Sequence, residues 1–376
     1  MVSIGIVGLP NVGKSTLFNA LLKKQQAYVA NYPFATIEPN IGVVPVPDYR
    51  LERLAQIVQE SDSRRLKPPI KPAVVNFVDI AGLVKGASEG AGLGNKFLSH
   101  IREVSVIAHV VRVFEDENIL KEGMVDPKSD YETIRTELQI ADLQTLQNLS
   151  EKTLKADAFK KQTVEKLKQI LDSGKNAYEI SLSNEEKEAI KELNLLTLKP
   201  EILVLNVSEE DYKLEKLNPI VSRYTSILVQ PHEKIVVISA KIEAELAALS
   251  ENEQTEYLKE LGIEESGLER LIKKAYEELG LISFLTAPSS AKASEGQGEK
   301  WEVRAWTVRL GSTSLTASGE IHTDFMKKFI KAEVVSFPDF VQYNGWKGAR
   351  EHGKARFEGK DYIMQDGDVV EFKIGA

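Results

Sequence analysis

The sequence lacks cysteine and any apolar run long enough to span a bilayer. The missing thiols exclude disulfides, thiolate-ligated metal sites and a cysteine nucleophile, and they suit a reducing compartment. The longest apolar stretches, such as Val104–Val113 and Ile202–Val207, fall far short of the ~20 residues that cross a membrane. We therefore expect a soluble, cytoplasmic protein without a membrane partner.

A net positive charge is also lacking. The chain has 48 Lys and Arg residues against 56 Asp and Glu, which gives a formal net charge of -8. This balance excludes recognition of nucleic acid through overall charge, so any contact with RNA would need a local basic patch. The 376 residues are enough for two or three domains with a large core.

Apolar strands alternate with helical segments over residues 1–130, and the pattern returns after residue 198. Several of these strands are nearly continuous apolar runs, which is typical of a buried parallel sheet with helices on both faces. One α/β domain is therefore predicted from residues 1–130 and 198–281. Its predicted strands are Ser3–Val7, Ile41–Val46, Ala73–Asp79, Val106–Phe114, Glu201–Asn206 and Ile235–Ser239.

Residues 131–197 have helical periodicity instead. Ile134, Leu138 and Ala141 form one apolar stripe, and Val164 and Leu167 begin another. Two such stripes predict an antiparallel helical hairpin, a coiled-coil domain inserted into the α/β domain. Its lysines indicate either a solvated helix face, which we favour, or a binding surface. They are Lys152, Lys155, Lys160, Lys161, Lys166 and Lys168.

A small mixed module is predicted for residues 282–376, after a low-complexity stretch that begins near residue 287. Strands are expected at Trp301–Leu310, Ala332–Ser336 and Val369–Ile374, with a short helix at Thr323–Ile330. Aromatic and basic residues alternate here, which indicates either an RNA-contacting surface or a solvated basic face. They are Tyr343, Trp346, Lys347, Arg350, Lys354, Arg356 and Lys360.

A phosphate-binding loop follows the first strand. Residues 8–15 read G-L-P-N-V-G-K-S and lead directly into a helix, which is the context that this motif requires. Backbone N–H groups of Asn11, Val12, Gly13, Lys14, Ser15 and Thr16 are predicted to surround the phosphates. Lys14 would reach the β- and γ-phosphates and stabilise developing charge, and the Ser15 hydroxyl would bind Mg²⁺.

Two further segments complete the predicted phosphate site. Asp79 begins D-I-A-G at the end of an apolar strand, where its carboxylate can hold Mg²⁺ through water and the Gly82 N–H can meet the γ-phosphate. Thr36 lies between the two motifs and is predicted to be the second hydroxyl ligand of Mg²⁺, which would release when the γ-phosphate leaves. Leu83 stands where related switches have a water-orienting glutamine, so intrinsic hydrolysis should be slow.

A base pocket is predicted from two strand ends. Asn206-Val207-Ser208-Glu209 stands where Ras-like proteins have N-K-x-D, and Ser239-Ala240-Lys241 matches their S-A-K loop. Glu209 is one methylene longer than the aspartate that reads guanine, and Val207 lacks a lysine stem that would cover the base. These changes remove the reason to prefer guanine, but they do not by themselves predict a preference for adenine.

Together these motifs resemble the Obg-like ATPases of the YchF type, an Obg-family branch of the TRAFAC class of P-loop NTPases. The resemblance covers essentially the whole chain, including residues 8–16, 31–40, 79–94, 206–209, 304–307, 319–325 and 359–363. It implies an α/β nucleotide-binding domain with a Ras-like P-loop fold, an inserted helical hairpin, a C-terminal TGS domain of the ubiquitin-like β-grasp kind, and ATP preferred over GTP. Asn206 and the Val207 backbone would then meet the adenine edge, beside Glu209 and Ser239.

The resemblance also implies partners and cofactors. These are Mg²⁺, the ribosome or its large subunit, and rRNA or tRNA as candidate contacts of the TGS and helical domains. Asn11 either supplies a K⁺ ligand or only shapes the turn. Lys121 stands in a loop where many relatives carry histidine, so no catalytic base is assigned. Two alternatives stay open: an Obg-type GTPase with degenerate base specificity, and a nucleotide-bound adaptor with little catalytic role.

Overall fold

Two β-sheets organise the chain in the computed structural model, which describes residues 2–31, 41–61, 65–80, 92–114, 126–149, 157–228, 232–288 and 301–375. Each sheet belongs to its own unit. The first unit comprises Met1–Val44 and Asn76–Ala275, and the second comprises Pro45–Val75 and Tyr276–Ala376. Within the described ranges, no helix has both the length and the apolar character needed to cross a membrane.

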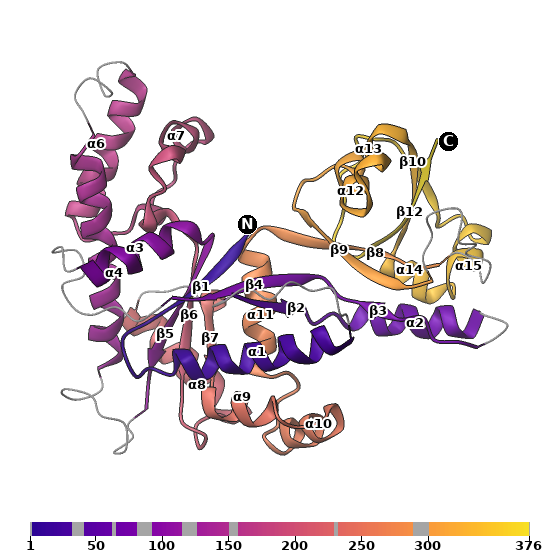
Figure 1. The fold of residues 1–376 in the computed structure, drawn as a ribbon, viewed down its shortest axis with the longest axis horizontal. Helices are drawn as coiled ribbons and strands as arrows, with labels where there is room; N and C mark the ends of the chain where they lie inside the picture. The colour runs from indigo at the N-terminus through magenta and orange to yellow at the C-terminus, as the bar shows by residue number, and fades with distance from the viewer. Residues whose placement is uncertain are drawn as a thin grey trace. The chain divides into compact units, whose positions relative to one another are not determined.

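The first unit contains a sheet with the strand order β2–β4–β1–β5–β6–β7 (Figure 1). β1 pairs in parallel with β4 and β5, and β6 pairs in parallel with β5 and β7. The carboxyl ends of these five strands therefore share one edge of the sheet, where ligands bind in open α/β folds. The strands are β1 (Ser3–Val7), β2 (Ile41–Pro45), β4 (Val74–Asp79), β5 (Val106–Arg112), β6 (Glu201–Asn206) and β7 (Ile235–Ile238).

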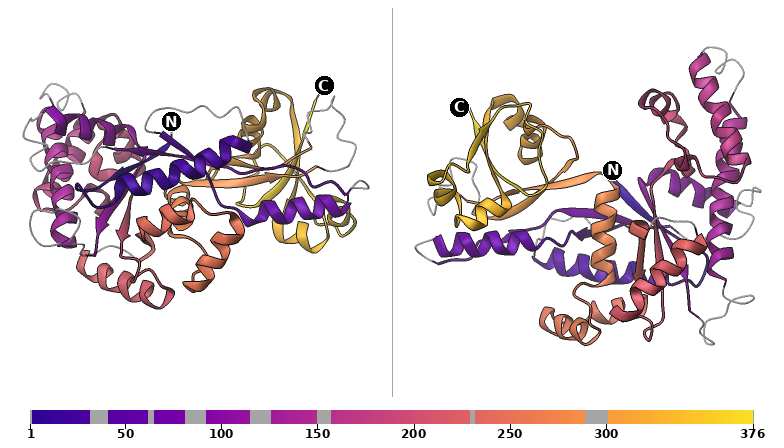
Figure 2. Two further views of the ribbon diagram at one scale, coloured as in Figure 1. Left: turned by 60° about the horizontal axis from the view of Figure 1, so that its bottom comes forward. Right: turned by 180° about the vertical axis from the view of Figure 1, so that it is seen from behind.

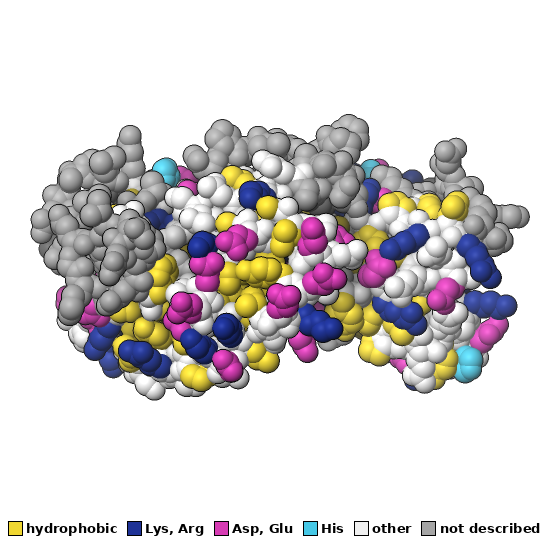
Figure 3. All heavy atoms as spheres, turned by 90° about the horizontal axis from the view of Figure 1, so that it is seen from below, with side chains coloured by type: hydrophobic (Ala, Val, Ile, Leu, Met, Phe, Trp, Pro, Cys, Tyr) yellow, Lys and Arg dark blue, Asp and Glu magenta, His cyan; other side chains and the backbone are white. Residues whose placement is uncertain are grey.

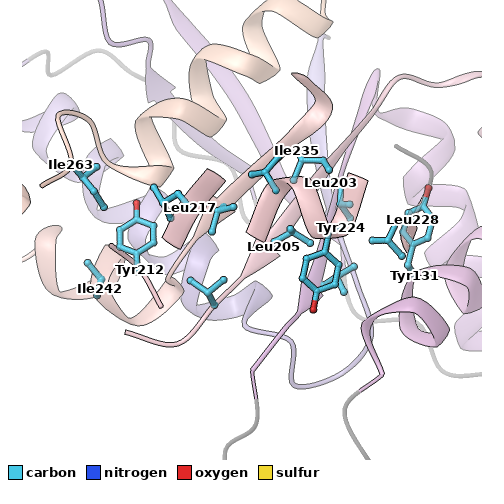
Figure 4. Packing of buried hydrophobic residues seen from close by; sticks show 14 of the residues in the cluster. Tyr131, Leu203, Leu205, Tyr212, Leu217, Tyr224, Leu228, Ile235, Ile242 and Ile263 are labelled. Atoms are coloured by element: carbon cyan, nitrogen blue, oxygen red, sulfur yellow. The ribbon is translucent and has the colours of Figure 1, made fainter. Parts of the chain in front are cut away.

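Helices lie on both sides of this sheet (Figures 1 and 2). They are α1 (Lys14–Asn31), α3 (Gly92–Glu103), α4 (Pro127–Gln147), α8 (Leu214–Leu228), α9 (Ala240–Leu246), α10 (Glu251–Glu260) and α11 (Gly267–Glu278). One apolar cluster joins α8 and α9 to β6 and β7 (Figure 4). A second cluster joins α3 and α4 to β1 and β5. β5 is buried along its whole length, as the continuous apolar run predicts.

The helical segment that follows β5 contains α4 and α6 (Ala158–Asp172). The end of α6 lies beside the middle of α4, where the Gln139 side-chain amide donates to the Gly174 carbonyl at 3.1 Å. Leu146, Val164 and Leu167 pack in one buried cluster between the two helices. Lys161 pairs with Glu165 and Lys166 with Glu186 at 3.7 and 2.9 Å, so these lysines form ion pairs at the helix surface.

Asp142 joins α4 to the chain that leads into β6. Its carboxylate is fully buried and accepts hydrogen bonds from the Leu196 and Thr197 N–H groups at 2.9 and 2.8 Å. The Thr197 hydroxyl donates to it at 2.7 Å. Burial raises the pKa of this carboxyl, and the hydrogen bonds from Thr197 and Leu196 oppose that change. These hydrogen bonds attach the residues that lead into β6 to α4.

The second unit contains a sheet with the order β11–β10–β12–β8–β9–β3. β8 and β9 are antiparallel, β12 lies parallel to β8, and α12 and α13 pack on the sheet through a core that includes Phe284, Ala317 and Val334. The strands are β3 (Ile70–Lys71), β8 (Leu281–Thr286), β9 (Val303–Arg309), β10 (Phe329–Ser336), β11 (Arg356–Glu358) and β12 (Asp368–Ile374). The helices are α2 (Tyr49–Ser61), α12 (Ser314–Ile321), α13 (Thr323–Lys328), α14 (Phe337–Gln342) and α15 (Trp346–Glu351).

Residues 45–75, which the sequence analysis assigns to the nucleotide-binding domain, pack in this second unit. Arg50 at the start of α2 donates to Asp366 at 2.7 Å, and the Tyr49 and Phe337 rings meet edge to face at 5.9 Å. β3 then pairs in parallel with β9. Such contacts join residues from 233 to 316 positions apart in the chain, so local sequence patterns do not reveal them.

Candidate nucleotide-binding site

The loop between β1 and α1 has the turned backbone that phosphate binding requires. Asn11 has a φ of 63°, a left-handed conformation that asparagine tolerates better than most residues. Gly13 has a φ of 99°, and a Cβ at this position would lie 2.4 Å from Asn206 Nδ2. Glycine is therefore required at Gly13 for its conformation and for the close approach of Asn206. The geometry of Asn11 agrees with its role in shaping the turn.

Lys14 is buried at the first turn of α1. Its Nζ donates to the Leu9 carbonyl at 2.7 Å, so the lysine is folded back over its own loop. Burial lowers the pKa of Lys14 to about 8, and the nearby negative charge of Asp79 partly opposes this change. An ammonium with little solvent and one neutral partner is suited to meet the charge of a phosphate.

Asp79 ends β4, where it pairs in register with Ile6 of β1. It is half-buried, and burial raises the pKa of its carboxyl while the charge of Lys14 lowers it. Ser15 and Thr16 are exposed at the start of α1. A carboxylate and a hydroxyl beside a phosphate loop are a donor set that suits Mg²⁺, which usually keeps several waters and binds phosphate oxygens. The residues present therefore fit this metal.

Four residues of the predicted site lie outside the described residues. They are Thr36, Gly82, Leu83 and Lys121. The roles assigned to Thr36 and Gly82 remain predictions.

Asn206 connects the phosphate loop to the segment after β7. Its side-chain amide donates to the Val12 carbonyl at 2.9 Å, and its Oδ1 accepts from the Ala240 N–H at 2.9 Å. The side chain is 4% exposed. Asn206 thus holds the phosphate loop against the S-A-K loop, and its second amide hydrogen and the second lone pair of Oδ1 are left over from these two contacts for a base. The sequence analysis predicts that Asn206 contacts the nucleotide base, but it does not predict these two hydrogen bonds.

Val207 and Ser239 are both buried. Val207 belongs to the apolar cluster of Figure 4, and its N–H donates to the Ile238 carbonyl at 2.8 Å. Because the Val207 N–H is already used, the Val207 carbonyl is the backbone group of this residue that could contact a base. Ser239 precedes α9, and its carbonyl accepts from the Glu243 N–H at 2.9 Å.

Glu209 forms an ion pair across the base pocket. Its Oε2 lies 2.5 Å from Nζ of Lys241, and both side chains are exposed. The carboxylate that replaces the guanine-reading aspartate is therefore occupied by a lysine of the S-A-K loop. Ala240 and Lys241 contact Asn206 and Glu209 of the predicted base pocket; the predicted ligand set omitted both, although their position in the S-A-K motif was the signal for them.

Most of the aromatic and basic residues that the sequence analysis names between positions 343 and 360 contact other residues of the second unit. Trp346 is 4% exposed and donates its indole N–H to the Ala287 carbonyl at 3.0 Å, so it is a core residue and not a stacking platform. Arg350 binds both carboxylate oxygens of Glu333, at 2.6 and 2.9 Å. Lys354 pairs with Asp339 at 3.4 Å. On the face drawn in Figure 3, basic and acidic side chains are intermixed.

The strand order, the turned loop before α1 and the position of Lys14 and Asp79 define a P-loop nucleotide-binding protein with a GTPase-type domain. A family model described as a 50S ribosome-binding GTPase matches residues 3–131. A second model, the YchF-type GTPase C-terminal family, described as a protein of unknown function (DUF933), matches residues 296–375.

Proteins called "Ribosome-binding ATPase YchF" are similar over almost the full chain. The protein of Haemophilus influenzae is 48% identical and that of Bacillus subtilis 44%, each over 99% of both chains. The solved structure of the Schizosaccharomyces pombe YchF GTPase is 35% identical, with a TM-score of 0.82 over 99% of this chain and 97% of that one. The chain belongs to the YchF family.

Proposed function

We propose that this protein is a ribosome-associated, Mg²⁺-dependent ATPase that acts as a slow nucleotide switch in the cytoplasm. The observation that carries the proposal is the buried Lys14, placed beside Asp79 at the carboxyl edge of a parallel sheet. The relatives called ribosome-binding ATPases, similar over the full chain, support both the hydrolase activity and the ribosomal partner.

In this proposal each residue of the phosphate site has one role. Lys14 leaves the Leu9 carbonyl, contacts the β- and γ-phosphates and stabilises charge that develops during hydrolysis. Ser15 and Thr36 offer hydroxyls to Mg²⁺, Asp79 holds it through water, and the Gly82 N–H detects the γ-phosphate. The metal, when bound, neutralises phosphate charge. Asn11 either supplies a K⁺ ligand, whose positive charge other switches take from an arginine, or only shapes the turn, with which its φ of 63° agrees.

ATP is proposed to bind more tightly than GTP. A guanine-reading carboxylate must accept from the N1–H and the exocyclic amine together. Lys241, which lies 2.5 Å from Oε2 of Glu209, competes with guanine for this carboxylate. Adenine offers no such pair of donors, so it binds without disturbing the ion pair. Asn206, through its remaining amide hydrogen, and the Val207 carbonyl would then meet the adenine edge.

The remaining parts are proposed to bind the ribosome. Apart from residues 45–75, which pack in the second unit, residues 1–130 and 198–281 form the nucleotide-binding domain, 131–197 an inserted helical hairpin, and 282–376 a β-grasp domain of the TGS type. The last two would contact rRNA or tRNA on the large subunit. The mixed sheet with α12 on one face agrees with a β-grasp arrangement.

Titration calorimetry on nucleotide-free protein, with ATP and GTP and with or without Mg²⁺, tests this function. ATP binding at least tenfold tighter, a difference of about 1.4 kcal/mol, is expected. Lys14→Ala should abolish hydrolysis and leave sedimentation with ribosomes intact. In Lys241→Met the carboxylate of Glu209 is released, so the preference for ATP should shrink. Tighter binding of GTP by the wild-type protein would contradict the assignment.

A GTPase is the second candidate function. It is favoured by the family model described as a GTPase and by the Schizosaccharomyces pombe relative, which is called a YchF GTPase. The same titration separates the two candidates, because only the base differs between the ligands.

A further inference from the structure

Two buried side chains join the base-pocket loops from within the first unit. Tyr212 lies three residues after Glu209, and Glu243 lies two residues after Lys241. The Tyr212 hydroxyl donates to Glu243 Oε1 at 3.2 Å. The two side chains are 0% and 1% exposed, so this contact is shielded from water. Neither residue belongs to the motifs that identify the nucleotide site.

Each of the two residues is also bonded through its backbone to one base-pocket loop. The Tyr212 N–H donates to the Glu209 carbonyl at 3.3 Å, and the Glu243 N–H donates to the Ser239 carbonyl at 2.9 Å. A displacement of either side chain is therefore passed directly to a residue of the predicted pocket. The contact between the side chains therefore links the two loops, in addition to the pairing of β6 with β7 and the Asn206–Ala240 hydrogen bond.

The start of α11 holds this pair in place. The Gly267 N–H points at both partners, 2.6 Å from the Tyr212 hydroxyl and 2.8 Å from Glu243 Oε1. Arg270 donates to the Tyr212 hydroxyl at 3.3 Å and to the Val237 carbonyl at 2.9 Å. A Cβ at Gly267 would lie only 2.8 Å from the Tyr212 hydroxyl, so glycine is needed for this approach. The hydroxyl thus has three polar neighbours in an apolar cluster.

We propose that Tyr212 and Glu243 are positioning residues that set the base affinity of the nucleotide site. This inference rests on the proposed nucleotide site, but it does not depend on whether adenine or guanine is preferred. Removing the Tyr212 hydroxyl takes away one buried link between the two loops, keeps the Asn206–Ala240 hydrogen bond and leaves the phosphate loop untouched. The base should therefore bind more weakly, while the phosphates should not.

The experiment compares Tyr212→Phe with Tyr224→Phe in the full chain. Both rings lie in the same apolar cluster, and in the view of Figure 4 their hydroxyls point in different directions. Both substitutions remove one hydroxyl, but only Tyr212 touches Glu243. Calorimetry measures the Kd for ATP, for GTP and for Mg²⁺-tripolyphosphate, which has no base. Thermal unfolding of each variant reports any general loss of stability.

In Tyr212→Phe we expect a Kd for the preferred nucleotide that is roughly three- to tenfold higher, as for the loss of one buried hydrogen bond. The Kd for tripolyphosphate and the kcat at saturating nucleotide should stay within about twofold of wild type, and Tyr224→Phe should match wild type for every ligand. Glu243→Gln keeps the accepting oxygen and should bind nucleotide almost normally, whereas Glu243→Ala should weaken it at least as much as Tyr212→Phe.

The inference is overturned if Tyr212→Phe binds nucleotide like wild type, or if nucleotide and tripolyphosphate weaken by the same factor. A wild-type protein that binds tripolyphosphate but neither nucleotide would overturn the proposed function together with this inference. Normal nucleotide binding that is unaffected by Tyr212→Phe would overturn the inference alone.

Discussion

Asn206 is the residue whose replacement by aspartate tests the geometry of the site most directly. The substitution Asn206→Asp keeps the shape of the side chain and exchanges its amide nitrogen for an oxygen. Asn206 Oδ1 would still accept from the Ala240 N–H, but the new oxygen would face the Val12 carbonyl oxygen at about the present 2.9 Å. An attraction between the strand end and the phosphate loop becomes a repulsion.

The magnitude follows from burial, since the side chain is 4% exposed. Leaving the Val12 carbonyl without its donor costs about 1–3 kcal/mol, and burying a carboxylate adds to this. We expect a loss of about 3 kcal/mol in the free energy of unfolding, which is roughly a hundredfold change in the folding equilibrium. ATP should bind at least about tenfold more weakly, because the phosphate loop is displaced.

Urea unfolding at several pH values is the assay. Burial beside a carbonyl oxygen raises the pKa of the introduced carboxyl in the folded state, and its protonated form can donate to Val12. The loss of unfolding free energy in Asn206→Asp should therefore be largest near pH 8 and should become smaller as the pH falls toward 5. Asn252→Asp makes the same chemical change at an exposed position of α10 and should alter stability by no more than about 0.5 kcal/mol. Wild-type stability of Asn206→Asp at pH 8 would refute this reasoning.

Three further results are expected. Burial lowers the pKa of Lys14 in the free protein to about 8, so the affinity for ATP should fall above pH 8. The phosphate charge raises this pKa in the complex, so ATP binding above pH 8 should take up a proton. Calorimetry in buffers of different ionisation enthalpy measures the uptake, and its absence would contradict the buried-lysine account. Gly13→Ala should lower the free energy of unfolding in urea by about 2 kcal/mol, because the φ of Gly13 is 99° and the new Cβ would displace Asn206. Unchanged stability would mean that the close approach of Asn206 to Gly13 is not required. Asp142→Ala removes three buried hydrogen bonds and should lower the free energy of unfolding by about 3 kcal/mol in the same assay, while the Kd for ATP stays unchanged. A higher Kd for ATP would show that the helical segment is coupled to the nucleotide site.

Local sequence patterns were sufficient to predict the strands of the first sheet and the phosphate loop. Strands β1 and β6 begin and end where the apolar runs predicted, and β4, β5 and β7 differ only by one or two residues at their ends. These features follow from local causes, namely apolar periodicity and the backbone freedom of glycine before a helix. Lys14 and Asp79 were predictable because each stands at a strand or helix end that the pattern itself marks.

Which of these residues touch one another depends on the tertiary structure. Asn206 contacts Val12 across 194 positions, Glu209 meets Lys241 across 32, and Tyr212 meets Glu243 across 31. The same holds for Trp346, for which the sequence pattern left an RNA-contacting surface as one alternative and which is buried. Contacts of this kind depend on the strand order and register of a whole sheet, and no local pattern records which strand ends become neighbours.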